Sequence, residues 1–349
     1  MIDFRYHLVS IIAVFLALAI GLTVGATALS GPVLAALHAE LKRVSQNEAS
    51  LAKDKQDLLQ QVGADQAFAQ AGSHAVLCGI LAGQKVVLVV APGADSNVTN
   101  GVTAALGQAG ATVTGQVNLN QSFLDTTGRN ESVLSELAQT LAPTLNVTLP
   151  ASTAGAPGGQ KAAATVLAAA LLTKSLASGS TTTVPASAAA SALNQFAQDN
   201  FVSVTGPHGS TSLAAATMAV LIVPAGPPVA GSVGFQAAQV LPAVAAQLKA
   251  AGDGTVMAGP VSAIGGNSAI SAENNTGQVS TVDYADTVTG AIMVAQALNF
   301  ALNGKAPTQY GVGPGTAPSP APTACPTPAG VSPSASSSPT PTRSTGGHK

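Results

Sequence analysis

Lys85-Val-Val-Leu-Val-Val90 is the stretch that decides the fold of this chain, and the turn Ala91-Pro-Gly-Ala-Asp95 follows it directly. Its valines and leucine run together with no polar residue between them. Strands of this kind are buried on both faces, as in parallel sheets that are covered by helices on either side. The stretch therefore predicts a central strand of an α/β domain.

The residues after this strand complete one β-α-β unit. Residues 97–107 (NVTNGVTAALG) are expected to be helical, and a second strand is expected from about 110 to 119. Two parallel strands joined through a helix require a right-handed crossover.

The chain then repeats this alternation of strands and helices. In order, we expect a helix at 186–199, strands at 201–205 and 218–223, a helix at 235–251 with a kink or restart at Pro242, a strand at 254–258 and a long helix to about Asn303. Such alternation favours a Rossmann-like, parallel-sheet α/β region over residues 66–313.

Two segments of biased composition interrupt or follow this region. Residues 151–180 are dominated by Ala, Gly, Ser and Thr, with a helix expected at 162–176, and they mark where the region would divide into two halves. Residues 314–349 consist mainly of Pro, Ser, Thr and Ala, so they cannot bury a core and are expected to be a disordered tail.

The chain begins with a segment long enough to cross a membrane. Residues 8–31 (LVSIIAVFLALAIGLTVGATALSG) are uncharged, and about 20 apolar residues span a bilayer core. We expect residues 1–31 to be an uncleaved anchor in the plasma membrane that contacts lipid through 8–31, with the bulk of the chain extracytoplasmic. A removable signal sequence is the alternative, because Ala26-Thr27-Ala28 fits a cleavage site.

A heptad pattern follows within residues 32–65. The apolar residues on alternating three- and four-residue steps are Leu34, Leu37, Leu41, Val44, Leu51, Leu58 and Val62. Glu48 and Lys55 occupy the two remaining positions of the same seam, where polar residues lower stability and set register. This pattern predicts a coiled coil that forms a homo-oligomer through 34–62, or a single amphipathic helix that packs on the following domain.

The composition excludes several classes of partner and site. The net charge is −2 and charged residues make up 8% of the chain, so no nucleic-acid partner is expected. The five histidines are isolated from one another and from the two cysteines, so no metal ligands can be named. Cys78, in the apolar run AVLCGIL, is interpreted as a buried, inert thiol, although an oxidising compartment would permit a disulfide with Cys325.

Few residues suggest a binding site. Residues 155–161 (GAPGGQK) lack the Gly-Lys-Ser/Thr ending of a phosphate-binding loop and follow no buried strand, so we reject that motif. Asp95 and Ser96 come directly after a strand, where α/β sheets bind ligands, and they are the best generic site candidates. The alternative is that one of them caps the next helix.

Asp283 and Asp286 are the second candidate pair. Two carboxylates three residues apart share a face if the segment is helical. The alternative is that Ser280, Thr281 or Asp283 caps the long helix that follows. Because no catalytic set is recognisable, we do not expect an enzyme, and both catalytic and cofactor-binding residues remain unassigned.

Several short motifs resemble one protein family. The sequence resembles the MctB copper transport proteins of actinobacteria at motifs that occur in the same order as in that family. These motifs are Met1-Ile-Asp-Phe-Arg-Tyr-His7 with Val9-Ser10 and the run at 13–19, the strand at 81–87, Val279-Ser-Thr-Val-Asp283 and Gln309-Tyr-Gly-Val-Gly313. The resemblance extends over most of residues 1–313.

The resemblance implies a function in copper export and copper homeostasis, with copper as the transported ion and an envelope transport machinery as partner. It also implies an outer-membrane location, as the family is described in mycobacteria. It carries no copper ligand onto a residue of this chain. The residues themselves favour an alternative, a membrane-tethered coiled-coil scaffold of the cell envelope without transport activity.

Overall fold

The computed structural model describes residues 4–150, 158–174, 183–210, 212–226, 233–263 and 268–317. The chain divides into two compact units, residues 1–67 and residues 68–349. The expectation of disorder for residues 314–349 is wrong for 314–317, because Ala317 pairs with Tyr310 and its N–H donates to the Gln309 carbonyl at 2.7 Å. The rest of the expected tail lies outside the described residues.

The first unit is formed by helix α1 (Phe4–Leu77), whose last residues belong to the second unit. Tyr6–Gly25 has a mean hydropathy of 2.6, and no side chain of this segment is buried. Its length and apolar surface are those of a membrane span, so the predicted N-terminal apolar helix is confirmed.

The heptad seam lies further along the same helix. Its described apolar side chains are between 44% and 67% exposed. The helix that the heptads predict is therefore present, whereas association through the seam stays a prediction. We call residues 34–62 the stalk.

The second unit, which we call the head, is described to Ala317 and contains one seven-stranded sheet. Its strands are β1 (Lys85–Val90), β2 (Thr112–Leu119), β3 (Val202–Thr205), β4 (Met218–Ile222), β5 (Gly254–Ala258), β6 (Ser280–Val282) and β7 (Gln309–Tyr310). Its α-helices after α1 are α2 (Ser96–Gln108), α3 (Gln121–Leu124), α4 (Arg129–Leu141), α5 (Gly158–Leu171), α6 (Ala186–Gln198), α7 (Val233–Ala251), α8 (Ala269–Thr276) and α9 (Val288–Leu302).

The strand order is β3-β2-β1-β4-β5-β6-β7. All neighbours are parallel except β2 and β3, which pair antiparallel at the edge. The predicted parallel α/β fold is thus confirmed. Strands from both sides of residues 151–180 join this one sheet, because β1 pairs directly with β4.

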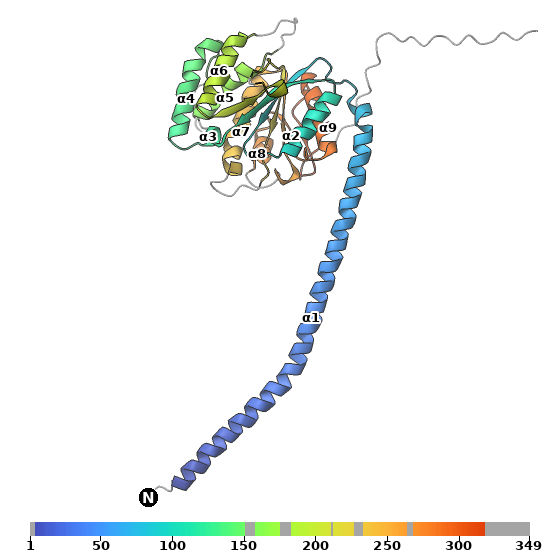
Figure 1. Ribbon diagram of the computed structural model, residues 1–349, viewed down its shortest axis with the longest axis vertical. Coiled ribbons are helices and arrows are strands. Elements are labelled where there is room, and N and C mark those ends of the chain that lie inside the picture. Colours follow the sequence, from blue (N-terminus) through green and yellow to red (C-terminus); the bar gives the residue numbers. More distant parts are fainter. Residues whose placement is uncertain are drawn as a thin grey trace, which may run out of the picture. The chain divides into compact units, whose positions relative to one another are not determined.

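Helices cover both faces of the sheet (Figure 1). On one face, α2 and α9 pack on side chains such as Val86 and Leu88 of β1. On the other face, helices from α3 to α8 pack on side chains such as Val87 and Val89. Successive residues of β1 point to opposite faces, which is why the whole strand is apolar.

A glycine permits the one irregularity between β1 and β2. The register shifts between Val86 and Val87, and Val87 pairs with Gly115. Gly115 has φ +143°, and a Cβ there would lie 2.7 Å from the Thr205 carbonyl oxygen. Only glycine allows the edge strand β3 to approach β2 this closely.

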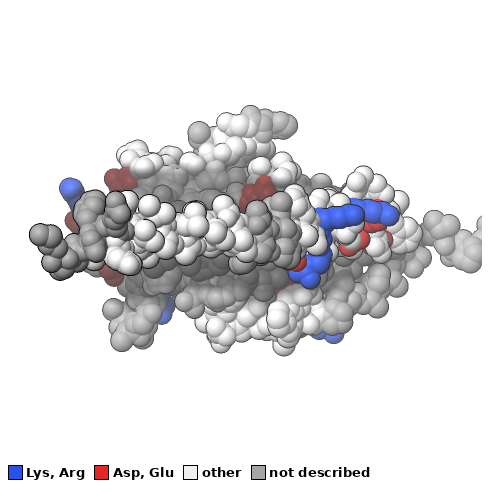
Figure 2. Space-filling model, turned by 90° about the horizontal axis from the view of Figure 1, so that it is seen from below, with Lys and Arg blue, Asp and Glu red and all other residues white. Residues whose placement is uncertain are grey.

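Charged side chains are sparse on the surface of the described residues. Figure 2 shows a few small groups of blue and red atoms among atoms that are mostly white or, where residues are not described, grey. This agrees with the charged content of 8%.

Candidate functional site

The sequence candidates Asp95 and Ser96 lie at the carboxyl edge of the sheet, directly after the turn that follows β1. The strand order reverses between β1 and β4, and α/β folds bind ligands at such a switch point. However, Asp95 is the N-cap of α2, and its Oδ1 accepts a hydrogen bond of 2.8 Å from the Asn97 N–H. The capping interpretation is therefore confirmed, and Ser96 is the first residue of the helix.

Asp283 is also at the carboxyl edge, but its carboxylate is hydrogen-bonded to the backbone of the protein. The side chain is 1% exposed and accepts hydrogen bonds from the N–H groups of Val312 at 2.9 Å and Gly313 at 3.1 Å. A Cβ on Gly311 would lie 1.9 Å from its Oδ1, so glycine is required there. Asp283 thus holds the segment after β7 against the end of β6.

Asp283 and Asp286 would share a helix face only if their segment were helical, and it is not. Both residues lie between β6 and α9 and outside any helix, and Asp286 is exposed, with a contact of 3.4 Å to the Val261 N–H. A loop forms because Asp283 turns back to the segment after β7 instead of starting the helix.

The expected caps of α9 are also wrong, because Thr287 caps this helix through a hydrogen bond of 3.0 Å from the Gly290 N–H. The three side chains that we expected to cap the helix have other partners. Ser280 accepts from the Thr308 N–H, and Thr281 donates to Asn274.

The two candidate sites do not combine. β4 and β5 lie between β1 and β6, so Asp95 and Asp283 are separated by three strand spacings, about 14 Å. The carboxyl edge therefore presents a helix cap and a structural carboxylate.

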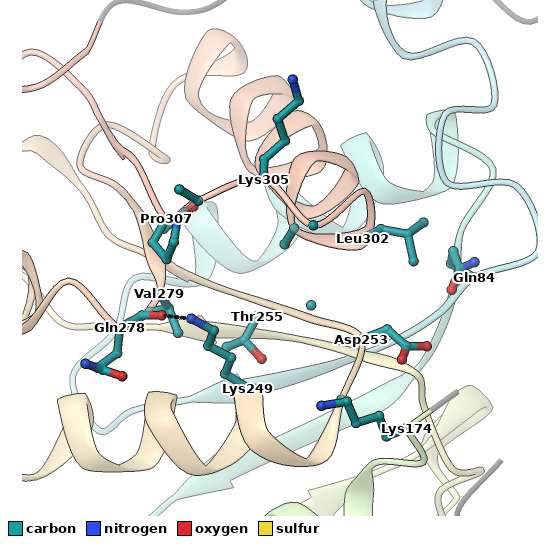
Figure 3. Close-up of a pocket in the computed structure, with 16 residues that line it drawn as sticks. Gln84, Lys174, Lys249, Asp253, Thr255, Gln278, Val279, Leu302, Lys305 and Pro307 are labelled. Carbon is teal, nitrogen blue, oxygen red and sulfur yellow. Dashed lines mark hydrogen bonds between the residues drawn. The ribbon is translucent and has the colours of Figure 1, made fainter. Parts of the chain in front are cut away.

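A pocket of about 700 Å³ opens at the opposite, amino edge of the sheet (Figure 3). Gln84 precedes β1, Asp253 precedes β5, and Gln278 precedes β6. The sequence analysis did not identify this site, which we call the amino-edge pocket. Its volume is in the range of small-molecule sites.

Three lysines line the amino-edge pocket, and each follows or ends a helix. Lys174 comes after α5, Lys249 lies in the last turn of α7, and Lys305 comes after α9. Cations are favoured in the last turn of a helix, and of the three lysines only Lys249 lies within its helix. Helices that run antiparallel to the strands bring these three ends to one edge.

Thr255 forms part of the wall between these lysines. Its side chain is 3% exposed, and its Oγ1 has no hydrogen-bond partner among the described residues. In Figure 3, Thr255 lies between Lys249 and Asp253, while Lys305 points away from the other labelled side chains.

A buried glutamate supports one side of the pocket. Glu273 is fully buried, and its carboxylate accepts from the Val279 N–H at 2.7 Å and from the Thr276 hydroxyl at 2.9 Å. Lys249 donates to the carbonyl of the neighbouring Gln278. Burial raises the pKa of Glu273, while the Val279 hydrogen bond acts in the opposite direction.

We expect Glu273 to make stability depend on pH. Because its pKa is higher in the folded than in the unfolded state, its contribution is largest below the ordinary glutamate pKa and is lost as pH rises through the raised value. Glu273→Gln should remove this slope in urea unfolding between acidic and neutral pH. Glu273→Ala should cost about 1–3 kcal/mol, since the Val279 N–H loses its acceptor.

The exposed Glu136 provides the matched control for this experiment. Glu136→Gln should leave the pH slope unchanged. Equal slopes in the parent and Glu273→Gln would contradict the assignment.

Comparison with known proteins identifies the family of this chain. A family model described as "Copper transport outer membrane protein, MctB" matches residues 1–321. The chain belongs to the MctB family.

Relatives in mycobacteria cover nearly the same length. Copper transporter MctB of Mycobacterium tuberculosis (strain ATCC 25618 / H37Rv) is 30% identical over 329 residues, which cover 90% of this chain and 98% of that protein. Copper transporter MctB of Mycobacterium leprae (strain TN) is 29% identical over 321 residues, with the same coverage. The predicted resemblance is confirmed.

The structure gives a physical reason for one pair of MctB-like motifs. Residues 279–283 and 309–313 are distant in sequence, but they form the neighbouring strands β6 and β7. Asp283 from the first motif accepts hydrogen bonds from Val312 and Gly313 of the second. These motifs therefore close the edge of the sheet.

Copper ligands are not grouped in the part of the chain that the structure describes, because it contains no cluster of three His, Cys, Asp or Glu side chains able to hold a metal ion. The interpretation of Cys78 as a buried free thiol is wrong, since Cys78 is half-buried and disulfide-bonded. The chain's other cysteine, Cys325, lies outside the described residues. A disulfide sulfur is no longer the thiolate that binds soft metal ions.

Proposed function

We propose that this MctB-family protein serves copper export across the cell envelope, with copper as cargo. The family match over residues 1–321 carries the proposal, and it is supported by mycobacterial relatives that are named copper transporters. The alternative of a tethered scaffold without transport activity is not favoured by these relatives.

The proposed location places the span Tyr6–Gly25 in the plasma membrane and the head outside the cytoplasm. Arg5 precedes the span, as is typical of a cytoplasmic N-terminus. The name of the matching family supports a contact with the outer membrane as well.

Self-association through the stalk is the second part of the proposal. One helix alone cannot surround a path for an ion, whereas several copies bring several spans together. The stalk exposes apolar side chains in heptad positions, and a second copy would cover them. Spans that enter the same membrane favour parallel helices, so Glu48 would lie opposite Glu48 of the second copy, and likewise Lys55.

Removing these polar layers should strengthen association. Glu48→Leu combined with Lys55→Leu replaces two like-charged layers by leucine, and we expect at least about tenfold tighter association of the full chain in detergent. Sedimentation velocity measures the change. Lys53→Leu with Asp57→Leu alters the same kinds of charge outside the seam and should leave association unchanged. A monomer in all three proteins, also after cross-linking in membranes, would contradict the stalk proposal.

The experiment that tests the function is a deletion strain grown over a range of added copper. We expect the strain to accumulate copper and to become sensitive, and the intact gene should restore both properties. Leu51→Lys with Leu58→Lys should restore neither property if stalk association is needed. Copper content and tolerance equal to those of the parent strain would reject copper export and leave the scaffold as the alternative.

A further inference from the structure

The amino-edge pocket gathers positive charge on an acidic head. Residues 68–317 contain six lysine and arginine residues against nine aspartate and glutamate residues. Three of the six cations line this one pocket, together with one acid, Asp253. The local charge is therefore opposite to that of the head as a whole.

Two of these cations are not used by the protein itself. The ammonium groups of Lys174 and Lys305 form no hydrogen bond or ion pair with the described residues, although the backbone N–H of Lys305 donates to the Phe300 carbonyl at 3.0 Å. Lys249 donates to the Gln278 carbonyl, which uses one of the three donors of its ammonium group. Lysine nitrogens with unused donors bind carboxylate and phosphate oxygens through charge-assisted hydrogen bonds.

The Thr255 hydroxyl is a second, independent sign of a ligand. It is buried in the pocket wall and has no partner among the described residues. Buried polar atoms in folded proteins are almost always hydrogen-bonded, to protein, to water or to a ligand. A ligand oxygen that meets this hydroxyl would lie within the space between Lys174 and Lys249 that Figure 3 shows.

The surroundings limit the ligand to a small one. The C-termini of α5, α7 and α9 carry partial negative charge from their backbone carbonyl groups. The attraction for an anion therefore comes from the lysine ammonium groups. Asp253 adds a repulsive charge that disfavours large polyanions. Leu302 and Val279 supply apolar wall for an uncharged part of the ligand.

We infer that the amino-edge pocket binds a small organic or inorganic anion that carries a carboxylate or phosphate group. The acidic group of the ligand lies between Lys174 and Lys249, and one of its oxygens accepts a hydrogen bond from the Thr255 hydroxyl. Lys305 adds positive charge to the lining of the pocket. All residues that line this site belong to the head, and the inference does not depend on copper export.

Titration calorimetry of the full chain in detergent tests the site, with L-malate and inorganic phosphate as probes. We expect saturable binding of at least one probe, and the two arms show whether carboxylate or phosphate is preferred. Lys174→Gln and Thr255→Val should each weaken binding about tenfold, the loss of one charge-assisted hydrogen bond.

Two controls keep the test decisive. Arg129→Gln removes the same charge at the start of α4, away from the pocket, and should leave affinity unchanged. Thr255→Val should also raise the melting temperature of the ligand-free protein, because it removes an unpaired buried hydroxyl. The melting temperature therefore shows that this variant is folded, independently of ligand binding. Absence of saturable binding of both probes, or equal affinities in the parent, Lys174→Gln and Thr255→Val, would overturn the inference.

Discussion

Replacing Asp283 by alanine is expected to lower the free energy of unfolding of the head by about 4 kcal/mol. The carboxylate is buried and is the acceptor for two backbone N–H groups, those of Val312 and Gly313. Its removal leaves both donors without a partner at the edge of the sheet. Gly311→Ala should be comparably harmful, because the new Cβ would overlap the carboxylate.

Hydrogen exchange followed by mass spectrometry measures this effect on the segment 309–317, and thermal unfolding followed by circular dichroism measures it globally. Asp283→Asn keeps one acceptor oxygen and should lose about half as much stability. Asp286→Ala is the matched control, since Asp286 is exposed and makes one long contact. If the segment 309–317 shows the same rate of hydrogen exchange in Asp283→Ala and Asp286→Ala, Asp283 does not hold this edge of the sheet.

Removal of residues 1–33 is expected to release the whole protein from the membrane into the soluble fraction. Tyr6–Gly25 is the one segment among the described residues that is long and apolar enough to span a bilayer. Without it, the apolar surface that holds the chain in lipid is lost. Carbonate extraction of membranes, followed by immunoblotting, measures the distribution.

A graded version of this experiment keeps the chain length constant. Phe15→Arg with Leu16→Arg places two charges near the middle of the span, at a cost of about 3 kcal/mol each, and should also reduce insertion. Phe15→Leu with Leu16→Ile keeps the span apolar and should not. The intact mass of the mature protein decides between anchor and signal sequence: a chain that begins at Leu29 and is soluble would show cleavage after Ala26-Thr27-Ala28.

Local sequence patterns were sufficient to predict the strands and helices whose consecutive residues are buried in a regular way. The run Lys85–Val90 became β1 with the same bounds, because a strand buried on both faces must be apolar throughout. The helix predicted at 97–107 became α2, and its cap Asp95 was one of two residues proposed for that place. The predicted strand at 254–258 likewise matches β5.

The sequence by itself determined the apolar N-terminal helix, the heptad seam, the alternation of strands and helices, and the family, because each is encoded in neighbouring or regularly spaced residues. Only the tertiary structure decided the antiparallel pairing of β3, the partners of Asp283 about 30 residues away, and the cap at Thr287. It also brought Lys174, Lys249 and Lys305 to one edge of the sheet. These features depend on which strands become neighbours, and strand order is set by the packing of the whole core.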